Sequence, residues 1–172
     1  LSSKLAYARH FPAIDWLQSY SLYQDRLNSW FNQHVSSDWS ALVQKTMALL
    51  QEESELDEIV RLVGIDALSY RDRLTLECTR SIREDYLHQN AYHEVDTYSS
   101  PKKQYLLLKT ILSFYEKSLA ALQEDAPFSK LVGLPVREQI GRMKYVPETE
   151  IEARCDEISR QMSEQIRALT EG

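Results

Sequence analysis

The chain has 172 residues, of which 43% are hydrophobic and 27% are charged, and its formal net charge is −6. This length suits one domain with a buried core, or one domain and an arm. The acidic balance, with lysines and arginines scattered along the chain, argues against a nucleic-acid surface, which requires clustered basic residues.

The chain opens on an aromatic-rich stretch without helical periodicity, residues 9–21 ("RHFPAIDWLQSYS"). We expect an extended arm over residues 1–21 and a helical domain over residues 22–172. The first residue is Leu1 rather than methionine, which predicts that the chain is a piece of a longer or processed protein.

The first half of the helical domain carries three segments with a helical period. A weak one covers residues 22–33, and a stronger one follows a capping stretch at residues 36–38. A separate helix is predicted to start at Ser54, because Asp57 lies three positions on in a near capping box. It should end at Gly64, a plausible left-handed C-cap. Its apolar stripe comprises Leu56, Ile59, Val60 and Val63.

The rest of the domain carries four more helical segments. One starts at Ser69, and another starts at Pro101, because proline suits the first helical turn. A weaker piece covers residues 136–144, and a last helix follows Pro147 and runs almost to the end. No stretch alternates like a half-buried strand. The pattern therefore predicts an all-α bundle of five to seven helices with short loops.

Most familiar catalytic patterns are missing from the chain. There is no glycine-rich phosphate loop and no recognisable nucleophile, so we predict no catalytic residue. The two cysteines, Cys78 and Cys155, form neither a disulfide framework nor a zinc pattern and suit a reducing cytosol. The longest apolar stretch, residues 105–115, is too short to span a bilayer and is interrupted by Lys109.

One polar cluster could suggest a metal ion. It follows the helix that starts at Ser69 and comprises His88, His93, Glu94 and Asp96. Its spacing provides no i, i+4 ligand pair, and no third anchor is evident elsewhere. We therefore predict solvated polar residues and no metal site.

Aromatic residues on two distant loops are less easily explained by a plain bundle. Phe11 lies in the opening arm, and Tyr92 and Tyr98 lie beyond the end of a helix, in residues 89–100. A single loop aromatic usually caps a core. Rings from two loops instead raise the prospect of a pocket for a flat ligand.

The whole chain resembles the C-terminal part of the catalytic A subunit of archaeal and vacuolar-type rotary ATPases. The resemblance is carried, in order, by "RHFPAIDWLQSYSLY", "ELDEIVRLVGIDALSYRDRLTLE", "REDYLHQNAYHEVDTY", "LLLKTILSFYEKSL" and "PVREQIGRMKYVPE". In this family the "HFPAI" strand leaves the nucleotide-binding α/β domain and leads into the helical bundle. The resemblance therefore implies that the arm is the end of that domain.

The resemblance also implies a nucleotide role for the aromatic loops. Phe11 would pack on the adenine ring, Tyr92 and Tyr98 would line the same pocket, and Val95 would supply a small neighbour. ATP or ADP with Mg²⁺ would be bound by the intact parent. Its phosphate loop and catalytic glutamate lie upstream, and an arginine comes from the neighbouring subunit. The chain alone should therefore be inactive and should bind no nucleotide tightly.

A second implied site is the turn "DALSYRD". It is similar to the acidic "DELSEED" turn with which the F-type beta subunit leans on the rotor. The implied rotor-contact residues are Asp66, Leu68, Ser69, Tyr70, Arg71 and Asp72. The F-type motif has carboxylates where this chain has Ala67, Tyr70 and Arg71, so contact should depend less on negative charge and more on shape.

The implied partners are the non-catalytic B subunit, in an alternating ring, and the central-stalk rotor subunits. The parent would be cytoplasmic, peripheral on the membrane, and would couple ATP hydrolysis or synthesis to the movement of protons or sodium ions. Two alternatives remain open. The chain could be a free-standing helical interaction module, and the turn could be only a capped helix junction. A rotor lever predicts that Leu68 is exposed, whereas a structural turn predicts that it is buried.

Overall fold

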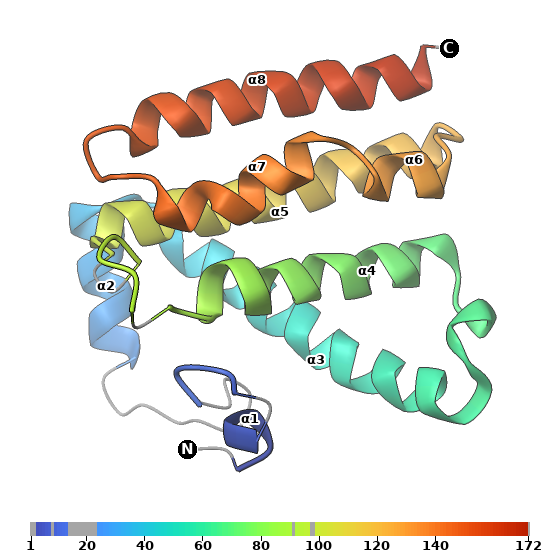
Figure 1. Cartoon of the computed structure of the whole chain (residues 1–172), viewed down its shortest axis with the longest axis horizontal. Helices are drawn as coiled ribbons and strands as arrows, with labels where there is room; N and C mark the ends of the chain where they lie inside the picture. Colours follow the sequence, from blue (N-terminus) through green and yellow to red (C-terminus); the bar gives the residue numbers. More distant parts are fainter. Residues whose placement is uncertain (1–2, 8, 14–23, 91, 97–98, 172) are drawn as a thin grey trace.

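The computed structural model describes residues 3–7, 9–13, 24–90, 92–96 and 99–171. Every regular element in these ranges is helical (Figure 1), which confirms the all-α prediction. One short helix, α1 (Ser3–Tyr7), lies where an extended arm was expected. The predicted boundary between arm and bundle, at residues 21 and 22, lies outside the described residues.

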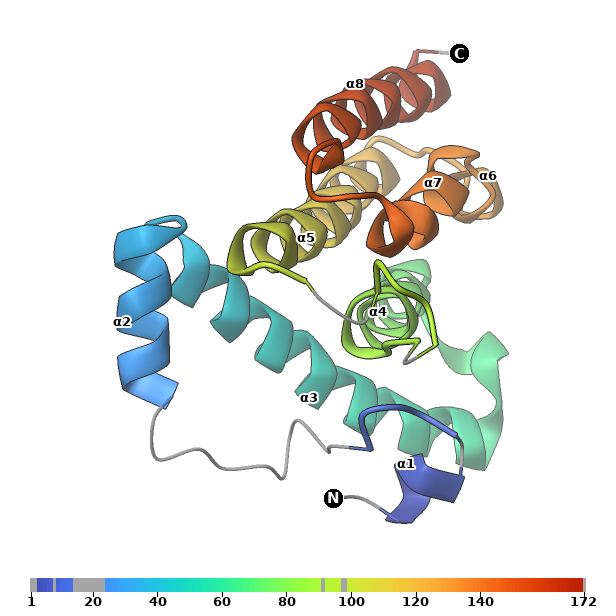
Figure 2. The ribbon, with the colours of Figure 1, turned by 60° about the vertical axis from the view of Figure 1, so that its left-hand side comes forward.

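Within the described residues, seven further α-helices and three short helical turns follow. The helices are α2 (Gln24–His34), α3 (Trp39–Val63), α4 (Tyr70–Ser81), α5 (Pro101–Gln123), α6 (Phe128–Val132), α7 (Val136–Arg142) and α8 (Ile151–Thr170). The turns are η1 (Ile65–Ala67) and η3 (Met143–Tyr145), which are 3₁₀-helical, and η2 (Ile82–Leu87), which is π-helical and continues α4. Helix α5 packs between α8 and α4, and α3 packs on α4 (Figures 1 and 2).

The predicted starts of two helices are confirmed by their caps. Ser69 Oγ accepts a hydrogen bond from the backbone N–H of Asp72 at 3.1 Å and caps α4. Ser100 Oγ accepts one from the backbone N–H of Lys103 at 3.0 Å, with Pro101 in the first turn of α5. Each bond satisfies one of the amide groups that a helix start leaves without a partner.

The predicted break at Ser54 is wrong, because α3 is one continuous helix of 25 residues. No glycine or proline interrupts it, and Ser54 lies exposed on its surface. The neighbouring Glu53 is buried and forms an ion pair with Arg83, whose Nη2 lies 2.6 Å from Glu53 Oε2. The helix ends at Gly64, as predicted, with φ of 87° and ψ of 163°, a region that essentially only glycine occupies.

The core is built from the apolar stripes that face one another on α4, α5 and α8. Its most buried members include Leu74, Ile82, Leu108, Leu112, Ile151, Ile158 and Met162. None of the described helices combines the length and the apolar composition that a membrane span requires.

Both cysteines are buried, and burial raises the pKa of Cys78 to about 12 and that of Cys155 to about 11. Because the thiolate is the reactive form, we expect native labelling by Ellman's reagent at pH 8 to be roughly 100- to 1,000-fold slower than labelling of an exposed thiol. Both thiols should react quickly in urea, which serves as the control. Rapid native labelling of either cysteine would contradict its burial.

Candidate functional sites at the two ends of α4

Two candidate sites lie at opposite ends of the helical segment formed by α4 and η2 (Figure 1). The turn between α3 and α4 is at one end, and the loop that begins at His88 is at the other. The opening arm docks at the loop end. There, the backbone N–H of Gln89 donates a hydrogen bond to the carbonyl oxygen of Phe11 at 2.8 Å. This hydrogen bond joins the arm to the loop.

His10 strengthens this junction through both of its ring nitrogens. Nδ1 lies 3.1 Å from the carbonyl oxygen of Pro12, and Nε2 lies 3.3 Å from that of Arg83 in η2. Carbonyl oxygens only accept, so the ring nitrogen is the donor in each of these contacts. The ring also contacts that of His88 edge to face, with centroids 5.2 Å apart. Partial burial and the positive charges of Lys144 and His10 lower the pKa of His88.

The predicted base-pocket residues are accessible where they are described. Phe11 is 52% exposed, Tyr92 is 99% exposed, and Val95 is partly buried. Tyr98 lies outside the described residues. A ring that capped the core would be buried, so that alternative is wrong for Tyr92. The described rings of Phe11 and Tyr92 are instead exposed to solvent, on the two segments that meet at the junction of arm and loop.

The loop has an internal hydrogen-bond network that the sequence did not reveal. Asp96, only 2% exposed, accepts a hydrogen bond from the backbone N–H of Asn90. The side-chain oxygen of Asn90 accepts one in turn from the backbone N–H of Tyr92 at 3.1 Å. His93 Nδ1 accepts one from the backbone N–H of Val95 at 3.3 Å. Two members of the polar cluster considered for a metal, Asp96 and His93, thus shape the loop.

Two lysines, also missed, tie the base of the loop to the bundle. Lys103 is fully buried, and its Nζ donates to the carbonyl oxygens of Lys144 and Val146, each at 2.8 Å. Lys144 is 8% exposed, and its Nζ donates to the carbonyl oxygen of Glu84 at 2.8 Å and of His88 at 3.4 Å. Burial lowers the pKa of Lys103. The sequence marked them only by position. Lys103 lies just inside a capped helix, and Lys144 lies in "PVREQIGRMKYVPE", one of the stretches that carry the family resemblance.

Asp85 lies in η2, close to α7. Ser81 Oγ donates a hydrogen bond to one of its carboxylate oxygens. A Cβ atom at Gly141 would lie 3.3 Å from the other, so a glycine at this position lets α7 approach η2 closely. Burial raises the pKa of the Asp85 carboxyl group.

Because that pKa is raised in the folded state, the native protein binds more protons than the unfolded chain at pH values just above the usual pKa of an aspartate. The contribution of Asp85 to stability is therefore complete below the unfolded pKa of about 4 and is lost as the pH rises through the folded pKa. We expect Asp85→Asn to remove this slope and to be at least as stable as the parent at pH 7. Urea unfolding from pH 4 to pH 8 measures it. An unchanged slope would contradict the assignment to Asp85.

At the other end of α4, the turn differs from the expected lever in one respect. Leu68 is only 7% exposed, so the expected exposure of the turn is wrong at this residue, and Leu68 has the structural role of the alternative. Tyr70 is 61% exposed, and its ring stacks on that of Phe128 at 5.4 Å. Arg73 fastens the turn, because it donates to the carbonyl oxygen of Leu68 and to the Asp66 carboxylate, each at 3.2 Å.

The end of α3 presents an apolar surface that the sequence assigned in part to the core. The prediction of burial is wrong for Ile59 and Val63, because the buried residues of α3 end at Leu56. Beyond that point α3 runs away from α5 and α8 (Figure 2). Four exposed side chains define what we call the tip patch: Ile59 at 42%, Leu62 at 79%, Val63 at 66% and Ile65 at 50% exposure.

An all-helical domain is the class of domain that the resemblance predicts, and every regular element of the described residues is helical. Residues 28–132 match the model of the C-terminal domain of V and A type ATP synthase, and the chain belongs to this family.

The curated relatives agree with the family. The chain is 59% identical over 169 residues to the V-type ATP synthase alpha chain of Acetivibrio thermocellus, with 98% of this chain covered. It is 58% identical over its full 172 residues to the protein of the same name from Thermoanaerobacter pseudethanolicus. The chain spans 29% of the length of each of these two relatives.

Proposed function

We propose that the chain is the helical C-terminal domain of a catalytic subunit of an ion-translocating rotary ATPase or ATP synthase. In this proposal it supplies the adenine end of a site that binds ATP or ADP with Mg²⁺. It also supplies a surface that meets the central-stalk rotor. The parent subunit alternates with a non-catalytic subunit in a ring on the cytoplasmic side of the membrane and moves protons or sodium ions.

The observation that supports the nucleotide role is the hydrogen bond between Gln89 and Phe11, which joins the arm to the loop. It places two open aromatic side chains, Phe11 and Tyr92, on the two segments that meet there. Flat rings bind adenine by stacking and need no charge. The phosphate groups, the Mg²⁺ ion and the reacting bond belong to parts of the parent subunit outside this chain.

The observation that supports the rotor role is the tip patch together with Tyr70. Exposed apolar side chains gathered at a hairpin tip are typical of a surface that meets another protein. The turn carries Asp66 and Asp72, but Arg73 pairs with Asp66, and Ser69 donates a hydrogen bond to the Asp72 carboxylate at 2.8 Å. Contact through apolar bulk therefore suits this tip better than contact through free negative charge.

The isolated chain should bind Mg-ATP only weakly, because stacking on Phe11 or Tyr92 occurs without phosphate contacts. We expect calorimetric titration to show no dissociation constant tighter than about 1 mM, the range of a few kcal/mol that partial contacts supply. The assembled parent complex, titrated in the same buffer, is the positive control. A micromolar dissociation constant for the isolated chain would overturn the division of the site between this chain and the rest of the subunit.

A further inference from the structure

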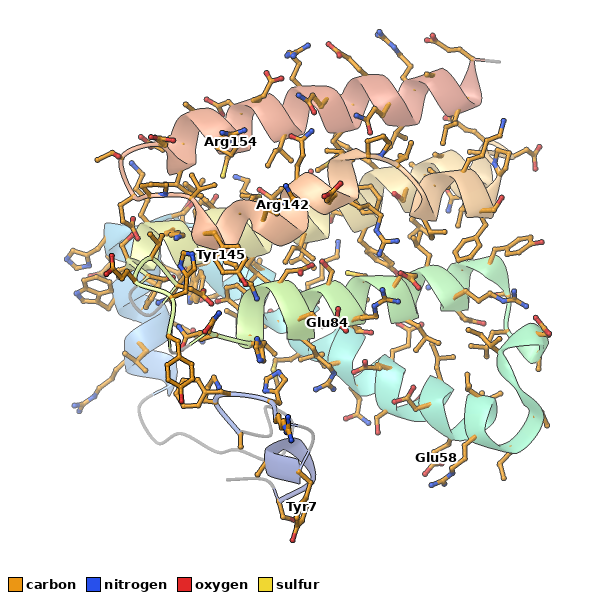
Figure 3. All side chains as sticks on the ribbon, in the orientation of Figure 1. Tyr7, Glu58, Glu84, Arg142, Tyr145 and Arg154 are labelled. Carbon is orange, nitrogen blue, oxygen red and sulfur yellow. The ribbon has the colours of Figure 1, made fainter. Side chains whose placement is uncertain are left out.

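We propose that Lys144 is a positioning residue for the adenine end of the site. It holds the described parts of the loop, residues 88–90 and 92–96, in the placement at which Tyr92 and Val95 meet the base. The inference rests on the proposed nucleotide role, and it concerns a residue that lies far from the aromatic rings in sequence. Figure 3 shows the neighbourhood, with Tyr145 and Glu84 labelled on the two elements that Lys144 connects.

The first step is the end of the π-helical turn. A helix end leaves carbonyl oxygens without intrahelical partners. Lys144 Nζ donates to the carbonyl oxygens of Glu84 and His88, the latter being the first residue after η2. A bond from a cationic donor is stronger than one between neutral groups, so the ammonium fixes the point at which the loop departs.

The second step is the loop itself, which transmits this placement to Tyr92. Asn90 lies two residues after His88 and bonds through its backbone to Asp96 and through its side chain to the backbone of Tyr92. Asp96 and Lys144 both line a pocket of about 210 Å³ beneath the loop, where Pro12 of the arm also lies. A shift at His88 would therefore be passed through Asn90 to the ring-bearing residues.

The third step is the anchoring of Lys144. Lys103, on the first turn of α5, donates to the carbonyl oxygens on both sides of Tyr145, those of Lys144 and Val146. The ring of Tyr145 contacts that of His93, with centroids 4.6 Å apart. Turn η3 is thus fixed by α5 and meets the loop at both His88 and His93, so Lys144 acts from a rigid base.

The test uses the full-length subunit in its assembled complex, with steady-state ATP hydrolysis as the assay. Lys144→Met keeps the length and apolar stem of the side chain but removes the ammonium. We expect it to raise the KM for ATP about fivefold, since a displaced base stack weakens ground and transition states alike, and to leave kcat within about twofold. Lys144→Arg retains a cationic donor and should restore KM. Lys130→Met, at an exposed lysine of α6, is the matched control.

A second pair of variants covers the case in which Lys144→Met fails to assemble. Asn90→Ala removes the acceptor for the Tyr92 amide, and Asn90→Asp restores it, so KM should rise in the first and recover in the second. Phe11→Ala is measured in parallel. If Phe11→Ala raises KM while Lys144→Met and Asn90→Ala do not, Lys144 is not a positioning residue and the proposed function stands. If Phe11→Ala also leaves KM unchanged, the proposed nucleotide role fails, and this inference fails with it.

Discussion

Replacing Leu68 with alanine should lower the free energy of unfolding of the 172-residue chain by about 2–5 kcal/mol, as for other buried leucines. Leu68 is 7% exposed, at the turn that joins α3 to α4. The backbone around it is held by Arg73 and by the Ser69 cap, so the cavity left by alanine should collapse only in part. Thermal melts should show a drop of about 5–15 °C for a domain of this size.

Leu62→Ala is the matched control, because it makes the same chemical change at a leucine that is 79% exposed. Its melting temperature should stay within about 2 °C of the parent, as for surface sites. In the assembled complex we expect Leu62→Ala, rather than Leu68→Ala, to have the larger effect. It should weaken the coupling of ATP hydrolysis to rotation. Equal melting temperatures for the two variants would contradict the structural role of Leu68. Normal coupling in Leu62→Ala would remove the support for the tip patch as the rotor surface.

Replacing Phe11 with alanine in the parent complex should raise the KM for ATP by roughly 5- to 150-fold, which corresponds to the 1–3 kcal/mol of a lost base stack. The ring is half exposed, at the point where the arm bonds to Gln89, so its loss should disturb the fold little. An adenine contact is made equally in the ground and transition states. The variant should therefore keep most of its kcat. Initial rates over a wide range of ATP concentrations measure both constants.

The matched control for Phe11→Ala is Tyr7→Ala, which removes an aromatic side chain from the same arm, 90% exposed but outside the predicted pocket. It should leave KM unchanged. Phe11→Tyr keeps a flat ring and should behave like the parent. If kcat falls in Phe11→Ala while KM holds, the ring acts on the chemistry or on assembly, and the adenine assignment is wrong.

The parts of the fold that depend on local chemistry were predictable from the sequence. Ser69 and Ser100 accept hydrogen bonds from amides three residues further along the chain, so a short stretch of sequence is enough to predict these caps. Ser54 carries the same kind of motif yet lies inside α3, because a serine on the surface of a helix costs little and nothing nearby breaks the helix. Local patterns therefore located helices better than they located boundaries.

The features that depend on long-range packing were not predictable. The apolar period of Ile59 and Val63 continues that of the core residue Leu56, and only the path of α3 past its neighbours shows that nothing covers them within the described part of the chain. Lys103 and Lys144 bond to carbonyl oxygens between 41 and 60 residues away. Every residue has a backbone carbonyl group, so the identity of the partner residue does not reveal such a contact, and no sequence motif predicts it.

The continuity of α4 and η2, from Tyr70 to Leu87, has a mechanical consequence. At about 1.5 Å per residue α4 is roughly 18 Å long, η2 extends it, and a hydrogen-bonded helix resists compression along its axis. Because the segment is stiff along its axis, a displacement of one end in that direction also moves the other end. The ion pair between Arg83 and Glu53 connects η2 to α3, the helix that carries most of the tip patch. In the proposed rotor role, a force applied at the turn between α3 and α4 would be carried along both helices towards His88, where the loop that carries Tyr92 begins.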